Sequence, residues 1–148
     1  MKQKMIIAVM VLVVLSGCTT TGTLTFLPTD IHVIKPDPGI GKVGEFSGIW
    51  SGNWDNASSQ ATAVVLEKID PAEVIAVYAW GPTSSYPGDS IRVSGKIENA
   101  STIVLEWGNV KRRVTLTRVG DKIHAEYRRA GQVNHAVLTK VPTPAPTQ

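Results

Sequence analysis

The chain has 148 residues, of which 43% are hydrophobic, and this length leaves room for one folded domain. Its formal net charge of +3 includes Lys2 and Lys4, and without these two the chain carries 13 basic and 12 acidic residues. Phosphate binding needs a basic surplus on one face, so this near-neutral balance excludes nucleic acid as an expected partner. The local cluster of Lys111, Arg112 and Arg113 is interpreted as the solvated face of neighbouring strands, with an anion site as the alternative.

The N-terminus has the parts of an export signal. Lys2 and Lys4 precede an apolar run over residues 5–15, which is shorter than the roughly 20 residues that span a bilayer. The run ends in Leu15, Ser16, Gly17 and Cys18. This ending resembles the lipobox of bacterial lipoproteins, in which Leu, a small residue and Gly or Ala precede the cysteine.

The resemblance implies that residues 1–17 are a signal peptide and that Cys18 becomes the lipid-carrying first residue of the mature protein. Its thiol would take up diacylglycerol, and the new amino group would be acylated, for example with palmitate. Acyl chains then hold the chain on a membrane. Thr19 stands where lipoproteins of the inner membrane commonly carry Asp, so the expected location is the outer membrane, facing the periplasm. The alternatives are an ordinary secretory signal with a coincidental cysteine, or an uncleaved anchor.

Residues 18–44 are rich in Thr, Pro and Gly, which predicts a lipidated N-terminus followed by a flexible tether. Two β-prone islands in it, 24–27 and 31–34, could pack on the domain or add a strand. Residues 142–148 alternate Pro with small polar residues and predict a disordered tail, or a Pro-rich recognition segment. The folded domain is therefore expected over residues 45–141.

Residues 45–141 show the pattern of a β meander, with turn signals between short runs of β-prone residues. The eight predicted strands are 46–54, 62–69, 74–80, 90–97, 102–107, 110–119, 122–128 and 133–139. Apolar residues alternate with polar ones in most of them, so one face must be covered, and the short connections favour an all-β, antiparallel up-and-down barrel. The run 74–80 is apolar on both faces, and we expect the N-terminal islands to cover its outer side, the alternative being a strand buried on both faces.

Gly48 and Trp50 open this meander with the spacing Gly-x-Trp. The pattern resembles the start of calycins, the lipocalin and avidin-like barrels. The resemblance implies that Trp50 plugs one end of the barrel under a cation from the last strands, Arg128 or Arg129. The chain lacks the Thr-Asp-Tyr motif, the disulfide and the terminal helix of lipocalins. An eight-stranded interior is either filled by side chains or holds one small ligand.

No arrangement of residues predicts an enzyme. Gly44 and Ser47 do not form a Gly-x-Ser-x-Gly elbow, and the three histidines, His32, His124 and His135, have no carboxylate or cysteine at ligand spacing. We therefore expect no catalytic residue, metal or cofactor.

The longest predicted loop offers the best candidate binding site. It follows Tyr78 and Trp80 and contains Tyr86, together with Ser, Gly and Pro. Aromatic rings beside small polar residues suit a sugar or a peptide. The alternative is that Tyr78 and Trp80 are core residues and Tyr86 caps a turn.

Two functional hypotheses follow from this reading. The first is a non-catalytic binding module for a small apolar molecule, a glycan or a protein partner at this loop. The second is a structural envelope lipoprotein that docks another envelope component, and a hydrolase with an unrecognised site is a distant third. An open cavity reached past Tyr86 would favour the first, and an interior filled by Trp50, Ile91, Leu105 and Tyr127 the second.

Overall fold

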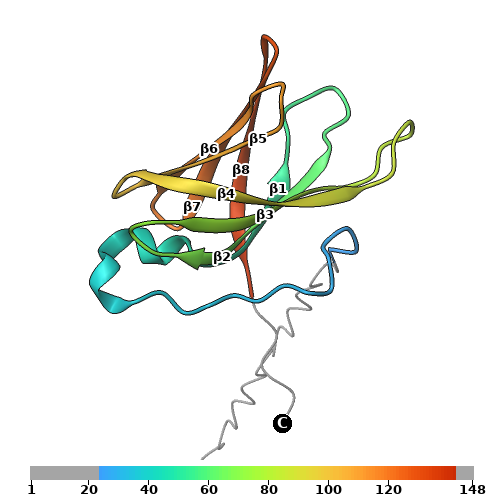
Figure 1. Cartoon of the computed structure of the whole chain (residues 1–148). Helices are drawn as coiled ribbons and strands as arrows, with labels where there is room; N and C mark the ends of the chain where they lie inside the picture. Colours follow the sequence, from blue (N-terminus) through green and yellow to red (C-terminus); the bar gives the residue numbers. More distant parts are fainter. Residues whose placement is uncertain (1–23, 143–148) are drawn as a thin grey trace, which may run out of the picture.

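The computed structural model describes residues 24–142. The predicted signal peptide, Cys18 and nearly all of the predicted tail fall outside these residues and stay predictions. The described part contains one 3₁₀ helix, η1 (Pro38–Phe46), and eight strands (Figure 1). The strands are β1 (Gly48–Asn53), β2 (Ala61–Ile69), β3 (Val74–Trp80), β4 (Asp89–Asn99), β5 (Thr102–Trp107), β6 (Arg112–Val119), β7 (Lys122–Arg129) and β8 (Gln132–Val141). Within residues 24–142, no helix has the length and apolar character needed to cross a bilayer.

The strands form a closed barrel in sequence order. Each pairs antiparallel with the next, and β8 returns to pair with β1. The predicted all-β, up-and-down barrel of eight strands is therefore confirmed. Several strand boundaries differ from the prediction by one or two residues, and the starts of two strands lie two residues later. The first strand begins at Gly48 because Phe46 still belongs to η1, and β6 begins at Arg112 because residues 108–111 form the turn after β5.

One end of the barrel is sealed by η1, and we call it the closed end. Val43 and Phe46 of η1 are buried in the core cluster with Trp50, which is 1% exposed. The indole Nε1 of Trp50 donates a 2.7 Å hydrogen bond to the carbonyl oxygen of Phe46. Because that carbonyl lies at the end of η1, this bond fixes the helix over the barrel.

The cation over Trp50 is Lys140, whose Nζ lies 5.3 Å from the ring centroid. Lys140 is also the direct partner of Trp50 in the β1–β8 register. Arg128, which the calycin resemblance implied for this role, lies near the opposite end of β7, where its Nε donates to Glu126. The predicted Arg128 contact is wrong because strand register places Arg128 and Arg129 beside the β7–β8 turn, away from η1.

Residues 24–37, which we call the N-terminal strap, pack on the outside of β2, β3 and β4. The amide N–H of Ile34 donates to the carbonyl of Glu67 at 2.7 Å, and Arg92 pairs with both Asp30 and Glu67. Figure 1 shows the strap (blue) running beneath β2 and β3. The tether prediction is corrected for this segment, which packs on the domain without forming a strand.

The strap explains the strand that is apolar on both faces. The inward residues of β2 and β3 belong to the core cluster of the barrel. Their outward residues Ala63, Val65, Val77 and Ala79 are also buried, with at most 1% exposed. They lie on the face that the strap crosses, so the covering by the N-terminal islands that we expected is confirmed.

Candidate functional site

The end opposite η1 carries four hairpin connections, and we call it the mouth. They join β1 to β2, β3 to β4, β5 to β6 and β7 to β8, over residues 54–60, 81–88, 108–111 and 130–131. Antiparallel pairing in sequence order places these alternate turns at one end. Inward-facing residues near the ends of β3, β5 and β7 therefore converge on the mouth.

The mouth is splayed open between β4 and β5. Residues 89–94 of β4 pair with β3, and within the described chain the pairing of β4 with β5 begins only at Gly95. A Cβ at Gly95 would lie 2.8 Å from the carbonyl oxygen of Val104, so glycine permits the close approach at this point. Beyond it the β3–β4 hairpin extends away from the barrel, toward the right of Figure 1.

Five aromatic side chains meet at the mouth. The ring of Tyr78 lies 5.0 Å from Trp107, 5.7 Å from Trp80 and 6.2 Å from Tyr127, measured between centroids. Trp107 and Tyr127 lie 6.4 Å apart, and Trp54 lies 5.9 Å from Tyr127. These separations are typical of favourable aromatic pairs. We call the five residues the aromatic cluster.

The cluster has a buried floor and a more accessible surface. Tyr78 is 6% exposed and Trp54 is also buried, whereas Trp80, Trp107 and Tyr127 are half-buried. Burial, with a smaller contribution from Tyr127, raises the pKa of the Tyr78 phenol to about 12. Tyr78 therefore stays uncharged at neutral pH. The three half-buried rings remain available to a ligand.

Each half-buried ring has a polar side chain directly opposite on the neighbouring strand. Trp80 pairs with Asp89, Trp107 with Arg112, and Tyr127 with Asn134. Residues directly opposite in an antiparallel pair point to the same face of the sheet. A carboxylate, a guanidinium and an amide therefore lie on the same face as the rings of the mouth.

The predicted trio of Tyr78, Trp80 and Tyr86 is only partly brought together. Tyr78 and Trp80 belong to the aromatic cluster, but Tyr86 is 73% exposed at the tip of the β3–β4 connection. Its carbonyl oxygen accepts from the amide of Thr83 and its own amide donates to Thr83 Oγ1, which is the turn that the alternative reading described.

Sequence reasoning missed Trp54, Trp107 and Tyr127 as members of one site. The signal was present, because Trp107 and Tyr127 continue the inward alternation at the mouth ends of their strands.

Side chains occupy the interior of the barrel from the closed end up to the cluster. Trp50 and Leu105 are fully buried, and Ile91 and Tyr127 pack against the same core. The interior is thus filled by the residues that the second hypothesis named. A ligand of this barrel is expected on the surface of the mouth.

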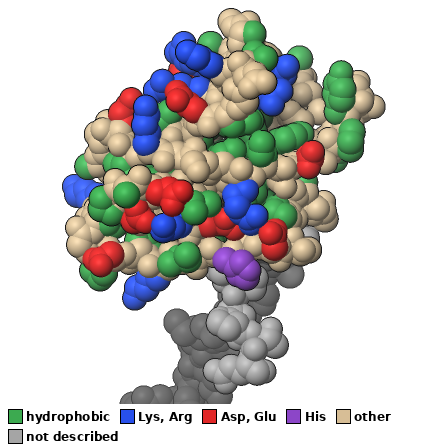
Figure 2. Space-filling view, in the orientation of Figure 1, with side chains coloured by type: hydrophobic (Ala, Val, Ile, Leu, Met, Phe, Trp, Pro, Cys, Tyr) green, Lys and Arg blue, Asp and Glu red, His purple; other side chains and the backbone are tan. Residues whose placement is uncertain are grey.

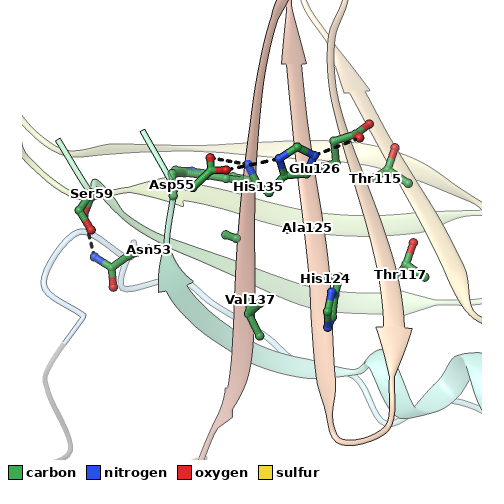
Figure 3. Close-up of a pocket in the computed structure, with 12 residues that line it drawn as sticks. Asn53, Asp55, Ser59, Thr115, Thr117, His124, Ala125, Glu126, His135 and Val137 are labelled. Carbon is green, nitrogen blue, oxygen red and sulfur yellow. Dashed lines mark hydrogen bonds and ion pairs between the residues drawn. The ribbon is translucent and has the colours of Figure 1, made fainter. Parts of the chain in front are cut away.

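A separate groove of about 650 Å³ lies between the β1–β2 loop and the outer side of β6, β7 and β8 (Figure 3). In it, His135 lies between two carboxylates, with Nδ1 3.4 Å from Asp55 and Nε2 3.4 Å from Glu126. His135 was expected to be isolated from carboxylates. That expectation is wrong because Glu126 is the direct partner of His135 across the β7–β8 hairpin, and closure of the barrel brings Asp55 to it from 80 residues away in the sequence.

The contacts in this groove tie the loop to β8. The backbone amide of His135 donates a 2.7 Å bond to Asp55, and this bond lowers the pKa of the Asp55 carboxyl. Arg128 lowers the pKa of Glu126, with a smaller effect from His135. Among residues 24–142, no group of three His, Cys, Asp or Glu side chains is placed to hold a metal ion.

Comparisons with known proteins show similarity in structure and none in sequence family. No protein-family model matches it, and no curated protein does. Among solved structures, a point mutant of the fluorescent protein UnaG aligns with a TM-score of 0.47 and 9% sequence identity, over 68% of this chain and 99% of that one. The barrel architecture therefore rests on this chain's own strand pairing, and the function on its own residues.

Proposed function

We propose that this protein is a lipid-anchored, non-catalytic binding module of the bacterial cell envelope that binds a saccharide at the aromatic mouth. The anchor is the predicted acylated Cys18, and the expected location is the outer membrane, facing the periplasm. The lipobox supports the anchoring, and the geometry of the mouth supports the binding. The two parts are tested separately.

The observation that carries the binding proposal is the pairing of rings with polar groups. Sugar rings present a flat apolar face and a rim of hydroxyl groups. Trp80, Trp107 and Tyr127 offer apolar area for the first. Asp89, Arg112 and Asn134 supply acceptors and donors for the second. A purely apolar ligand would leave these polar groups unpaired, so the set favours a saccharide.

Titration with soluble oligosaccharides tests the site. Oligomers of N-acetylglucosamine and soluble muropeptides are the first probes. Their binding is measured by tryptophan fluorescence and by calorimetry. Trp107→Ala should weaken binding about fivefold, because a stacked ring contributes about 1 kcal/mol and 1.4 kcal/mol is a factor of ten. Tyr86→Ala is the matched control, since this ring lies outside the cluster. Equal affinities of Trp107→Ala and the parent for every bound probe would refute the site.

Mass spectrometry of the protein from bacterial membranes tests the anchor. The parent chain should begin at Cys18 and carry acyl chains. Cys18→Ala should accumulate as a precursor that retains Met1. A correctly cut Cys18→Ala product would show that an ordinary signal peptidase acts here and that lipid is not the anchor.

The filled interior favours a second function, a structural lipoprotein that docks another envelope component. In that case the mouth rings would meet a protein surface. The two functions differ in one measurement, because only the first predicts a change in tryptophan fluorescence when purified protein meets oligosaccharide alone. Cross-linking in whole cells that depends on Trp107, together with no response to oligosaccharides, would favour the second.

A further inference from the structure

The two hairpin tips beside the aromatic mouth have an unusual composition. Residues 108–113 and 128–133 contain no acidic residue. They contain five basic ones, Lys111, Arg112, Arg113, Arg128 and Arg129. Figure 2 shows lysine and arginine side chains at the top of the molecule, where the β7–β8 hairpin ends in Figure 1. These tips form a positively charged rim on one side of the mouth.

Part of this charge is neutralised by the barrel wall, and part is not. Arg113 pairs with Glu98 and Glu106, and Arg128 pairs with Glu126. Among the ion pairs of residues 24–142, none involves Lys111, Arg112 or Arg129. Lys111 and Arg129, which lie outside the proposed saccharide site, therefore remain available to an anionic partner.

The same tips expose apolar side chains. Val110 is 54% exposed on the β5–β6 turn, and Val133 is 41% exposed beside the β7–β8 turn. Tyr86, at the tip of the β3–β4 connection, is the most exposed of the large hydrophobic residues in the described chain. Apolar tips among basic residues match a bilayer surface, where the apolar groups enter the interface and the cations meet lipid phosphates.

The course of the chain brings this end of the barrel near the predicted anchor. The ring of Phe26 lies 3.5 Å from the position that a Cβ at Gly81 would take, at the base of the β3–β4 hairpin. The strap therefore starts beside the mouth and runs to η1 at the closed end. The six Cα–Cα steps from Cys18 to Leu24 span at most about 22 Å. An acylated Cys18 would hold the base of the β3–β4 hairpin, on one side of the mouth, within that distance of the bilayer.

The turns of the closed end differ in composition. Lys68 pairs with Asp70 and Glu73 beside the β2–β3 turn, and the β6–β7 turn joins Asp121 to Lys122. Both signs of charge alternate there. This end therefore lacks the basic surplus that would attract anionic lipid.

From these observations we propose that the β5–β6 and β7–β8 hairpin tips dock on an anionic lipid surface, so that the aromatic mouth faces the membrane that carries the anchor. The proposal rests on the lipid anchoring proposed above. It adds an orientation and a second contact with the membrane. It also narrows the ligand class, because a saccharide at a mouth in this orientation would be the head group of a membrane lipid.

The test uses the full mature, acylated chain, purified from bacterial membranes and reconstituted into vesicles. Val110→Cys and Val119→Cys form a matched pair, because both valines are 54% exposed, Val110 in the β5–β6 turn and Val119 at the end of β6 beside the β6–β7 turn, at opposite ends of the barrel. Acylation consumes the thiol of Cys18, so an environment-sensitive fluorophore reacts only with the new cysteine. The vesicles contain phosphatidylglycerol with phosphatidylethanolamine, or phosphatidylcholine alone.

In the anionic vesicles, the label at position 110 should be severalfold less accessible to an aqueous quencher than the label at position 119. The difference should shrink in phosphatidylcholine, which carries no net negative charge, and in a Lys111→Glu, Arg129→Glu background, which replaces two unpaired cations by anions. Equal accessibility of the two labels on vesicle-bound protein would overturn the docking while leaving the anchor intact. Protein that fails to enter vesicles would overturn the anchor, and the docking with it.

Discussion

The two ends of the barrel use aromatic residues in opposite ways. At the closed end, Trp50 is covered by η1, its N–H bonds to the Phe46 carbonyl, and Lys140 lies over its ring. At the mouth, rings of similar size have polar neighbours, and three of the five remain half-buried. A ring with all its contacts satisfied within the chain stabilises the fold, whereas a ring left half open is free for a partner. The comparison suggests that stability and binding are separated along the barrel axis.

The largest expected effect is on the closed end. Trp50→Ala should lower the free energy of unfolding by about 3–5 kcal/mol, because it empties a buried site and leaves the Phe46 carbonyl without its donor. Trp107→Ala should lower the free energy of unfolding by about half that amount or less, because its ring is already half exposed to water. Urea unfolding followed by circular dichroism measures both. Equal losses would show that the mouth rings are as much part of the core as Trp50.

The next effect concerns the contact between β1 and β8, which closes the barrel and runs from one end to the other. A Cβ at Gly52 would lie 2.4 Å from the carbonyl oxygen of Val137 on β8, so Gly52→Ala should cost about 1–3 kcal/mol by forcing β1 and β8 apart. Because Gly52 lies between Trp50 and Trp54 on the same strand, the variant should also change tryptophan emission. Ser51→Ala is the control and should stay within about 0.5 kcal/mol. A Gly52→Ala variant as stable as this control would contradict the tight contact between β1 and β8.

The two ends also differ in how far the sequence predicts them. Alternation alone assigned the strands and the inward faces, because period-two patterning is a local property of each strand. The resemblance to calycins implied that Trp50 plugs one end of the barrel. The covering cation could not be predicted from pattern, because pairing of Lys140 with Trp50 depends on the register between the first and last strands. Lys140 lies in an ordinary strand sequence, and its neighbours in the sequence do not indicate that it contacts Trp50.

The mouth shows the same limit. Tyr78 and Trp80 were found as candidates because they lie two residues apart in one strand. Trp107 and Tyr127 come from other strands, and their convergence on Tyr78 follows from closure of the barrel. The pair of Asp55 with His135 is a stronger case, because it joins the first hairpin to the last strand. The position of the strap could not be predicted for a related reason. Glu67, which holds the strap through hydrogen bonds, appears in the sequence as an ordinary outward residue of β2.

A third prediction concerns the strap that links the two ends. Glu67 accepts hydrogen bonds from Arg92 and from the His32 amide, and Glu67→Gln should lower the free energy of unfolding by about 1–2 kcal/mol at pH 7. Burial alone would raise the pKa of Glu67, but the bonds from Arg92 and His32 outweigh it, so the pKa lies below its ordinary value of 4.5. A lowered folded-state pKa means that the contribution is complete above that value and is lost as pH falls through the folded pKa.

The difference between the parent and Glu67→Gln should therefore be constant from pH 7 to about pH 5 and shrink at lower pH. Urea unfolding across this range measures it, and hydrogen exchange of the Ile34 amide reports on the strap itself. Asp30→Asn is a useful control, because Asp30 contacts the same Arg92 from an exposed position and should have the smaller effect. A pH-independent difference for Glu67→Gln would mean that the charge of Glu67 does not hold the strap.

The smallest expected effect is at the most exposed ring. Tyr86 is 73% exposed and holds its turn through backbone contacts with Thr83, so Tyr86→Ala should change the free energy of unfolding by no more than about 0.5 kcal/mol. Oligosaccharide affinity should also stay unchanged, because this ring lies outside the aromatic cluster. Binding to anionic vesicles should weaken slightly, because Tyr86 is one of the apolar side chains exposed at the hairpin tips. A variant that lost oligosaccharide binding but kept its vesicle contact would move the ligand site from the cluster to the β3–β4 tip, and would restore the loop that the sequence alone suggested.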